Sequence, residues 1–282
     1  MKIEKVMIIG AGQMGLGIAQ VFASSGYQVI LNDLQESVLD HAIKSINKNL
    51  SRLVDKEKLL ENEKTKALNR ISTCISLDAA KDVDLVIEVA IEQLDVKKKI
   101  FTTLDKLISE HTILATNTSS LSISEIAAIT TSPKKVIGMH FMNPVPRMKL
   151  VEIIRGLETS DDVFNTICDI TKSLDKTPLE VKDFPGFVLN RILITMINEA
   201  IYTLYEGIAS KETIDEMMKL GANHPMGPLE LADLIGLDTC LFILETLHRG
   251  FGDGKYRPCP LLRQYVAAGR LGRKTGQGFY LY

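Results

Sequence analysis

A histidine and a glutamate twelve positions apart are the residues of this chain best suited to moving a proton. His140 follows the apolar run 136–139, and Glu152 lies in the next apolar run, 151–154. A neutral imidazole can take a proton from an alcohol, and a carboxylate on its other nitrogen would fix the tautomer and stabilise the imidazolium. Because a single histidine at a strand end is more often structural, the spacing alone leaves both interpretations open.

Two further groups of polar side chains could serve the same chemistry. Residues 116–120 follow the apolar run 112–115 and supply consecutive hydroxyl and amide groups, Ser119 among them. They could orient a substrate carbonyl and a nicotinamide, or they could form the turn before a helix that Ser122 caps. Asn190 lies early in a predicted helix, where it could reach a cleft from a second domain, although a helical asparagine usually has no special role.

A glycine-rich turn gives the clearest binding signal. Residues 10–15 read Gly-Ala-Gly-Gln-Met-Gly, directly after the apolar run 6–9 and at the start of a helical pattern. Gly10 permits a tight turn, Gly12 lets a pyrophosphate approach the backbone, and Gly15 permits close packing of helix against strand. With Gln13 and Met14 they form a loop whose amides and helix dipole favour a phosphate.

Asp33 indicates which dinucleotide is bound. It follows the apolar run 29–31 and lies 18 positions after Gly15. A carboxylate there accepts hydrogen bonds from a ribose diol and repels a 2′-phosphate. No arginine follows directly, so the sequence predicts NAD rather than NADP.

The elements that position these groups follow from hydrophobic patterning. Apolar runs at 6–9, 29–31, 85–89, 112–115, 136–139 and 151–154 alternate with helical patterns such as 13–25 and 94–108. That alternation is typical of a mostly parallel sheet covered on both faces. The Lys- and Glu-rich segment 36–69 is too long for a simple crossover and is predicted to be an inserted pair of helices, with a solvated surface as the simplest reading of its charges.

The pattern changes at residues 183–186, Asp-Phe-Pro-Gly. Residues 177–182 are strand-like, whereas helices are predicted afterwards at 187–206, 211–220, 228–248 and 261–268. The sequence therefore predicts a Rossmann-type, doubly wound α/β domain over residues 1–184, with a helix-pair insertion at about 36–70. A smaller all-α domain follows over residues 185–282.

Composition excludes several other classes of protein. The chain has 282 residues and a formal net charge of −2, which argues against nucleic acid as the main partner. No uncharged apolar stretch approaches the ~18 residues of a membrane span, and the N-terminus lacks a signal-peptide pattern. The four cysteines form no C-x-x-C pair, so no metal site is expected. These features predict a cytoplasmic protein.

Six motifs in order along the chain resemble those of the short-chain (S)-3-hydroxyacyl-CoA dehydrogenases, and within that family its bacterial branch acting on 3-hydroxybutyryl-CoA. They are GAGQMG at 10–15, NTSSLSI at 117–123, HFMNPVPRMKLVE at 140–152, PGFVLNR at 185–191, KLGANHPMGPLELADLIGLD at 219–238 and GRKTGQGFY at 272–280. Several long motifs in the same order are far more specific than any one of them, and together they span essentially the whole chain.

The resemblance implies a role for each matching residue. His140 would be the catalytic acid–base group with Glu152 as its partner, and Ser119 and Asn190 would hold the 3-oxygen and the thioester end of the substrate. Asp33 would bind the adenosine ribose. The remaining cofactor contacts implied are Glu92, Lys97, Asn117, Asn143 and Lys274. Lys56 and Asn49 fall where the inserted helices would meet CoA.

The resemblance also implies the reaction and the partners. The expected enzyme is an NAD-dependent oxidoreductase that interconverts (S)-3-hydroxybutyryl-CoA and acetoacetyl-CoA in fatty-acid or butyrate metabolism. The apolar faces of the C-terminal helices look too extensive for that domain to bury alone; they include Ile235, Leu237, Leu241, Ile243, Leu244 and Leu247. We therefore expect a homodimer through the C-terminal domain, as the family implies, with a higher oligomer left open.

Four positions depart from the family pattern without removing a catalytic group. Met142 stands where Phe is common, Thr116 where Ser is common, and Thr195 where Pro is frequent. Arg147 stands where a small apolar residue is usual, which leaves the acyl-chain preference open.

Three rival functions remain to be tested. One is a related dehydrogenase of sugar acids, in the L-gulonate dehydrogenase and lambda-crystallin branch, against which the basic insertion favours CoA. A 6-phosphogluconate type of mechanism would need a catalytic lysine where this chain has Asn190. The non-enzyme rival is a nucleotide-binding structural or redox-sensing protein.

Overall fold

The computed structural model describes residues 2–282, and the chain forms two compact units that divide after Asp183. The first unit, the sheet unit, is built on one eight-stranded sheet in the order β3-β2-β1-β4-β5-β6-β7-β8. Neighbouring strands are parallel except for β6 and β7, which are antiparallel. The strands are β1 Lys5–Ile9, β2 Gln28–Asn32, β3 Ile71–Cys74, β4 Leu85–Glu88, β5 Ile113–Thr116, β6 Val136–Phe141, β7 Leu150–Arg155 and β8 Thr177–Lys182.

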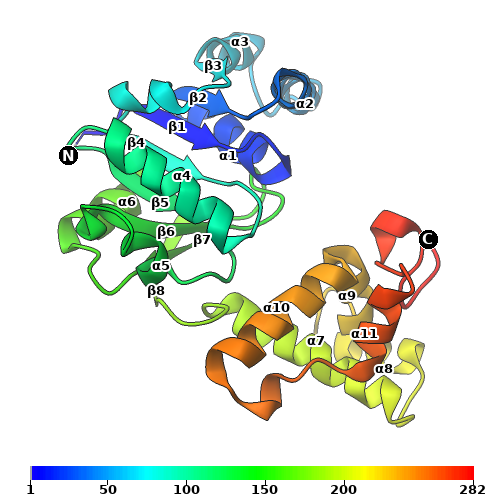
Figure 1. The fold of residues 1–282 in the computed structure, drawn as a ribbon. Coiled ribbons are helices and arrows are strands. Elements are labelled where there is room, and N and C mark those ends of the chain that lie inside the picture. Colours follow the sequence, from blue (N-terminus) through cyan, green and yellow to red (C-terminus); the bar gives the residue numbers. More distant parts are fainter. Residues whose placement is uncertain (1) are drawn as a thin grey trace. The chain divides into compact units, whose positions relative to one another are not determined.

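Helices cover both faces of this sheet, with α4 and α5 on one face and α1 and α6 on the other (Figure 1). The prediction of a mostly parallel, doubly wound sheet is therefore confirmed. The strand β3 was missed, because only its first residue, Ile71, is a large apolar one and its middle two are exposed. The helices of this unit are α1 Gln13–Ser24, α2 Glu36–Val54, α3 Glu61–Asn69, α4 Leu94–Leu107, α5 Ile123–Ala127 and α6 Asp161–Ser173.

The predicted helix-pair insertion is present as α2 and α3. Helix α2 buries one apolar stripe, formed by Leu39, Ala42, Ile46 and Leu50, and this stripe joins the hydrophobic core. The spacing of three to four residues is that of an amphipathic helix docked on its neighbour. The charged residues of the insertion therefore occupy its outer face.

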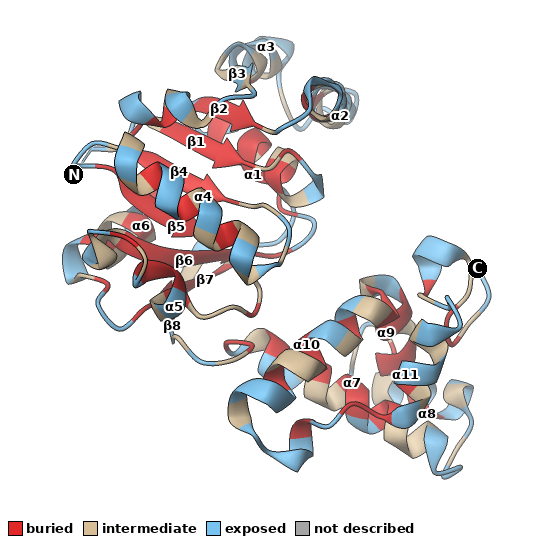
Figure 2. Cartoon of the chain, in the orientation of Figure 1, coloured by how far each residue is buried: buried red, intermediate tan, exposed pale blue. Residues whose placement is uncertain are grey.

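The second unit, the helical unit, consists of helices around a separate apolar core. Its helices are α7 Leu189–Tyr205, α8 Lys211–Ala222, α9 Pro228–Ile235, α10 Leu237–Phe251 and α11 Pro260–Ala267. Figure 2 shows their buried residues in red alternating with exposed ones along each helix. No helix within residues 2–282 is long and apolar enough to cross a membrane.

The single helix expected over 228–248 is wrong, because the chain breaks at Gly236 into α9 and α10. Gly236 has φ +103°, a conformation that side-chain-bearing residues rarely adopt. A Cβ there would lie 3.0 Å from a carboxylate oxygen of Asp238. The apolar periodicity runs through the break, so patterning alone could not detect it.

Candidate functional site

The glycine loop lies at the point where the strand order reverses. The chain leaves β1 towards β2 and β3 and later returns to β4 on the other side of β1, which opens a crevice at the carboxyl ends of β1 and β4. Gly10 has φ +102°, and a Cβ on it would lie 2.7 Å from the carbonyl oxygen of Val89. A Cβ on Gly15 would lie 1.8 Å from the carbonyl oxygen of Gly10. Both glycines are therefore required by close backbone packing.

The third glycine leaves room for a ligand. An ideal Cβ on Gly12 meets nothing within 4 Å, and Gly12 is the N-cap of α1 without any side chain to cap the helix. The first turn of α1 carries no acidic residue. Open space before an uncapped helix N-terminus suits a pyrophosphate, which would meet backbone amides and the positive end of the helix dipole. These residues fit a dinucleotide. Met14, next in the loop, packs against the core.

Two side-chain hydrogen bonds connect this loop to neighbouring segments. Asp33, at the end of β2, accepts a hydrogen bond from the backbone N–H of Ala11 at 2.9 Å, which fixes its carboxylate beside the glycine turn. The Gln13 amide donates to the side-chain oxygen of Asn143 at 3.3 Å. Asn143 lies in the segment after β6, so this contact joins the nucleotide loop to the segment that follows His140.

His140 and Glu152 are direct cross-strand partners in the antiparallel pair β6–β7. Nδ1 of His140 lies 2.8 Å from Oε2 of Glu152, and the two residues are only 7% and 2% exposed. Neighbours on each strand, Met139 and Ile153, point into the core below the sheet. Because side chains alternate along a strand, His140 and Glu152 lie together on the opposite face, the one that α5 covers. This is the geometry of an imidazole oriented by a carboxylate.

Asn117 connects the end of β5 to the end of β6. Its side-chain oxygen accepts a hydrogen bond from the backbone N–H of Phe141 at 2.9 Å, and its own N–H donates to the carbonyl oxygen of Glu88 at 2.8 Å. The polar segment 116–120 is therefore tied to the strand end that carries His140. Of the two interpretations of this segment, the structure bears out the turn before a capped helix, since Ser122 accepts from the N–H of Glu125 at 3.2 Å.

Glu92 organises the loop that carries Ser119. Its Oε1 accepts from the hydroxyl of Thr118 at 2.6 Å and from the N–H and hydroxyl of Ser119 at 2.8 and 3.1 Å. The N–H and hydroxyl of Ser120 also donate to it, at 3.1 and 3.2 Å. One carboxylate oxygen thus collects the donors of three consecutive residues and fixes the position of Ser119.

A buried ion pair between Lys97 and Glu88, which was not predicted from the sequence, supports Glu92. Lys97 is 1% exposed, and its Nζ donates to both oxygens of the fully buried Glu88 at 2.7 and 2.9 Å. Lys97 also lies 3.4 Å from Oε2 of Glu92. Although burial opposes ionisation, the Lys97 charge and the donors from Thr118 and Ser119 lower the pKa of Glu92. A glutamate inside the apolar run 85–89 was the signal that could have identified this cluster.

The remaining predicted residues lie on the insertion and in the helical unit. Asn49 of α2 donates to the side chain of Gln20 at 3.3 Å, and Lys56 is exposed just after α2. Asn190, the second residue of α7, is buried. Lys274 donates to both carboxylate oxygens of Asp238 at 2.6 Å.

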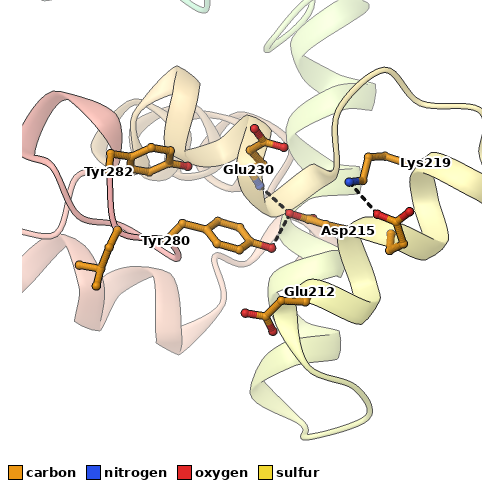
Figure 3. A pocket seen from close by; sticks show the side chains of 8 residues that line it. Glu212, Asp215, Lys219, Glu230, Tyr280 and Tyr282 are labelled. Carbon is orange, nitrogen blue, oxygen red and sulfur yellow. Dashed lines mark hydrogen bonds and ion pairs between the residues drawn. The ribbon is translucent and has the colours of Figure 1, made fainter.

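The helical unit also contains an acidic pocket of about 400 Å³ (Figure 3). Asp215 at its base accepts from the N–H groups of Leu229 and Glu230 and from the Tyr280 hydroxyl, so its carboxylate holds the N-terminus of α9. Four carboxylates against one lysine would repel the phosphates of a nucleotide or of CoA. The residues lining it are Glu212, Asp215, Glu216, Lys219, Glu230, Tyr280, Leu281 and Tyr282.

Comparison with known proteins identifies relatives along the whole chain. Residues 5–184 match the family model described as 3-hydroxyacyl-CoA dehydrogenase, NAD binding domain, and residues 186–282 match the model of the C-terminal domain of the same enzymes. A 3-hydroxybutyryl-CoA dehydrogenase of Bradyrhizobium diazoefficiens is 55% identical over 99% of this chain and 96% of its own. One from Clostridioides difficile is 53% identical over 99% of each chain. The crystal structure of (S)-3-hydroxybutyryl-CoA dehydrogenase from Ralstonia eutropha superposes with a TM-score of 0.97 at 52% identity, covering 100% of this chain and 99% of that one.

Proposed function

The chain belongs to the 3-hydroxyacyl-CoA dehydrogenase family, whose members are NAD-dependent oxidoreductases, and we propose that it interconverts (S)-3-hydroxybutyryl-CoA and acetoacetyl-CoA with His140 as the acid–base group. The observation that carries this proposal is the 2.8 Å contact between His140 and Glu152 on adjacent strands. The names of the relatives support the four-carbon acyl-CoA as substrate. The direction in the cell and a place in fatty-acid or butyrate metabolism remain part of the proposal.

His140 would transfer the proton of the substrate hydroxyl. Because its Nδ1 contacts Glu152, we assign the transfer to Nε2, which would take the proton in oxidation and return it in reduction. NAD⁺, when bound, supplies the acceptor for the hydride. The Glu152 carboxylate would hold the ring in one tautomer and stabilise the charge that the ring gains. The buried position of both residues strengthens that interaction.

Ser119 and Asn190 would orient the substrate. The loop of Ser119 is held by Glu92, which suits a hydroxyl that has to meet the 3-oxygen in a defined position. We assign Asn190, at the start of α7, to the thioester end. Asp33, Asn143 and the glycine loop would hold the cofactor, and Lys56 would contact a phosphate of CoA.

We also propose that the protein is a homodimer through the helical unit. The unit buries Leu237, Ile243, Leu244 and Leu247 in its own core, so the expectation that it could not bury these residues alone is wrong. Other large apolar side chains remain exposed there, among them Ile192 at 66%, Met217 at 65% and Leu220 at 78%. Exposed apolar surface of this kind is typical of an interaction face. The mass of the protein in solution tests this assignment, and a monomer at micromolar concentration would contradict it.

Steady-state reduction of acetoacetyl-CoA tests the proposed function. We expect NADH oxidation with acetoacetyl-CoA, a much lower kcat/KM with NADPH, and none with L-gulonate and NAD⁺. Asp33 supports the cofactor preference, since its carboxylate would repel a 2′-phosphate. Activity on gulonate without activity on acetoacetyl-CoA would assign the chain to the sugar-acid branch instead.

A further inference from the structure

A buried lysine outside the residues assigned so far contacts the segment that follows His140. Lys176 lies between α6 and β8 and is 8% exposed. Its ammonium donates to the carbonyl oxygen of Val145 at 2.6 Å and to that of Met148 at 2.7 Å. Both carbonyls belong to residues 142–149, which connect β6 to β7 and which we call the His140 loop.

The His140 loop lies mostly on the surface and is fixed at few points. Met142 and Val145 are buried, whereas most of the other residues of the loop, Asn143 included, are exposed. Val145 packs against Gly17 of α1, where a Cβ would come within 2.9 Å of the Val145 side chain. A side-chain hydrogen bond from Gln13 to Asn143 also joins the loop to α1. Lys176 therefore holds the main chain of the loop, while Gln13 and Gly17 of α1 contact its side chains.

We propose that Lys176 is a positioning residue for the cofactor, which acts by holding the His140 loop so that Asn143 stays against the glycine loop. The inference rests on the proposed role of Asn143 in cofactor binding. Two strong bonds to carbonyls three residues apart fix the curvature of the loop, and Asn143 lies two residues before the first of them. A shift of the loop would move Asn143 away from Gln13 and the nucleotide.

The electrostatics of the site favour this role over a merely structural one. A buried ammonium is costly when its hydrogen-bond partners are neutral carbonyls, whereas an apolar side chain would fill the same space at less cost. The charged groups that act on it are Lys149, which disfavours the ammonium, and Asp175, which favours it. Lys149 and Asp175 also pair with each other at the surface. Burial first, and then Lys149, lower the pKa of Lys176.

The direct test is NADH binding to the full-length Lys176→Met variant, followed by fluorescence without any acyl-CoA. Methionine matches the stem of lysine as far as Cε but lacks the ammonium and its donors. We expect the dissociation constant for NADH to rise by about tenfold to a hundredfold, since small displacements of positioning groups have effects of that size. Lys172→Met, on the exposed side of α6, is the matched control and should bind NADH as the wild type does.

Two further measurements separate positioning from stability. Lys176→Arg restores a charged donor and should recover part of the lost affinity. Wild-type affinity for NADH should weaken as the pH rises through the lowered pKa of Lys176. Lys149→Met removes a charge that lowers this pKa and should move the change to higher pH, whereas Lys176→Met should lack the change. If Lys176→Met does not fold, Lys176→Arg and the wild-type pH profile decide the question.

The proposal is wrong if folded Lys176→Met binds NADH within about twofold of the wild type, or if wild-type affinity does not change with alkaline pH. Because NADH binding requires neither acyl-CoA nor His140, the outcome is independent of the proposed substrate. Loss of NADH affinity in a protein that does not reduce acetoacetyl-CoA would support the role of Lys176 and contradict the proposed function.

Discussion

Buried carboxylates in the two units have partners of different kinds. In the helical unit, Asp233 is 1% exposed, and its oxygens accept from the backbone N–H groups of Phe279 and Tyr280 at 2.9 Å each. This fastens the C-terminal segment to α9. In the sheet unit, Glu152 is 2% exposed and contacts the imidazole of His140. The first carboxylate has neutral donors, two main-chain N–H groups and the Tyr282 hydroxyl, whereas the second has a partner that can change its charge.

The difference shows which buried charges stabilise the fold and which serve chemistry. A carboxylate that accepts hydrogen bonds from main-chain amides holds the backbone in place. A carboxylate beside histidine or lysine favours the charged form of its partner. Glu92 combines both properties, because it holds the amides of the Ser119 loop and also lies beside Lys97. Substitution of these residues separates the structural role from the chemical one.

Replacing His140 should have the largest effect. His140→Gln removes the acid–base group while keeping a polar side chain of similar size. We expect kcat for acetoacetyl-CoA reduction to fall by about 10³- to 10⁴-fold, or about 4–5.5 kcal/mol in the activation barrier. The dissociation constant for NADH should be unchanged, as measured by fluorescence. Turnover near the wild-type rate would exclude His140 from proton transfer.

Glu152→Gln should have a smaller effect on the same step. The amide keeps the shape of the side chain but cannot stabilise the imidazolium, so kcat should fall by about 10²-fold, equivalent to about 2.7 kcal/mol. The free energy of unfolding should change little in comparison. A variant with wild-type kcat between pH 6 and 9 would show that the pair does not work as a dyad.

Asp233→Asn should lower the stability of the protein and leave kcat nearly unchanged, in contrast to Glu152→Gln. Its amide nitrogen would face a main-chain N–H that now donates to a carboxylate oxygen, and the loss should destabilise the helical unit by about 2 kcal/mol. Urea unfolding can be followed by tyrosine fluorescence, because six of the seven tyrosines (all but Tyr27) lie in the helical unit and the chain has no tryptophan. The value of kcat at 20 °C should stay within about twofold of the wild type. A large loss of kcat without loss of stability would remove the distinction between the units.

The sequence predicted the parts of this molecule that depend on local pattern. Six apolar runs and the strand-like segment 177–182 located seven of the eight strands, and the glycines at 10, 12 and 15 located the loop at the switch point. The break at Gly236 was not predicted, because the helical periodicity continues through it. Strand β3 was not predicted, because it lacks an apolar run. These features depend on backbone conformation and sheet pairing rather than on side-chain period.

The site was predicted residue by residue, whereas its supporting contacts were not. His140 and Glu152 could be named from spacing and resemblance, but their facing positions require an antiparallel pair that the sequence did not specify. Glu88, in β4, pairs with Lys97 of α4. Lys176, just before β8, holds the Val145 carbonyl in the His140 loop. Contacts between residues far apart in the chain leave no periodic signal, so only the structure reveals them.

The smallest expected effect is a difference in the pH dependence of stability between Glu92 and Asp233. The pKa of Glu92 is lowered from its ordinary value of 4.5, because Lys97 and the Ser119 loop outweigh burial. Its stabilising contribution is therefore present above pH 4.5 and lost as the pH falls through the lowered pKa. Burial, together with the charge of Asp215, raises the pKa of Asp233 above 3.8, so its contribution is present below pH 3.8 and lost as the pH rises through the raised pKa.

The two variants should therefore differ from the wild type in opposite ways as the solution is acidified. The free energy of unfolding of the wild type relative to Glu92→Gln should decrease from neutral pH to about pH 4, whereas that relative to Asp233→Asn should increase. Urea unfolding at constant ionic strength measures both, with circular dichroism for the whole chain and tyrosine fluorescence for the helical unit. If both differences in the free energy of unfolding changed with pH in the same direction, the two carboxylates would have equivalent surroundings. The contrast between a charged and a neutral set of partners would then not hold.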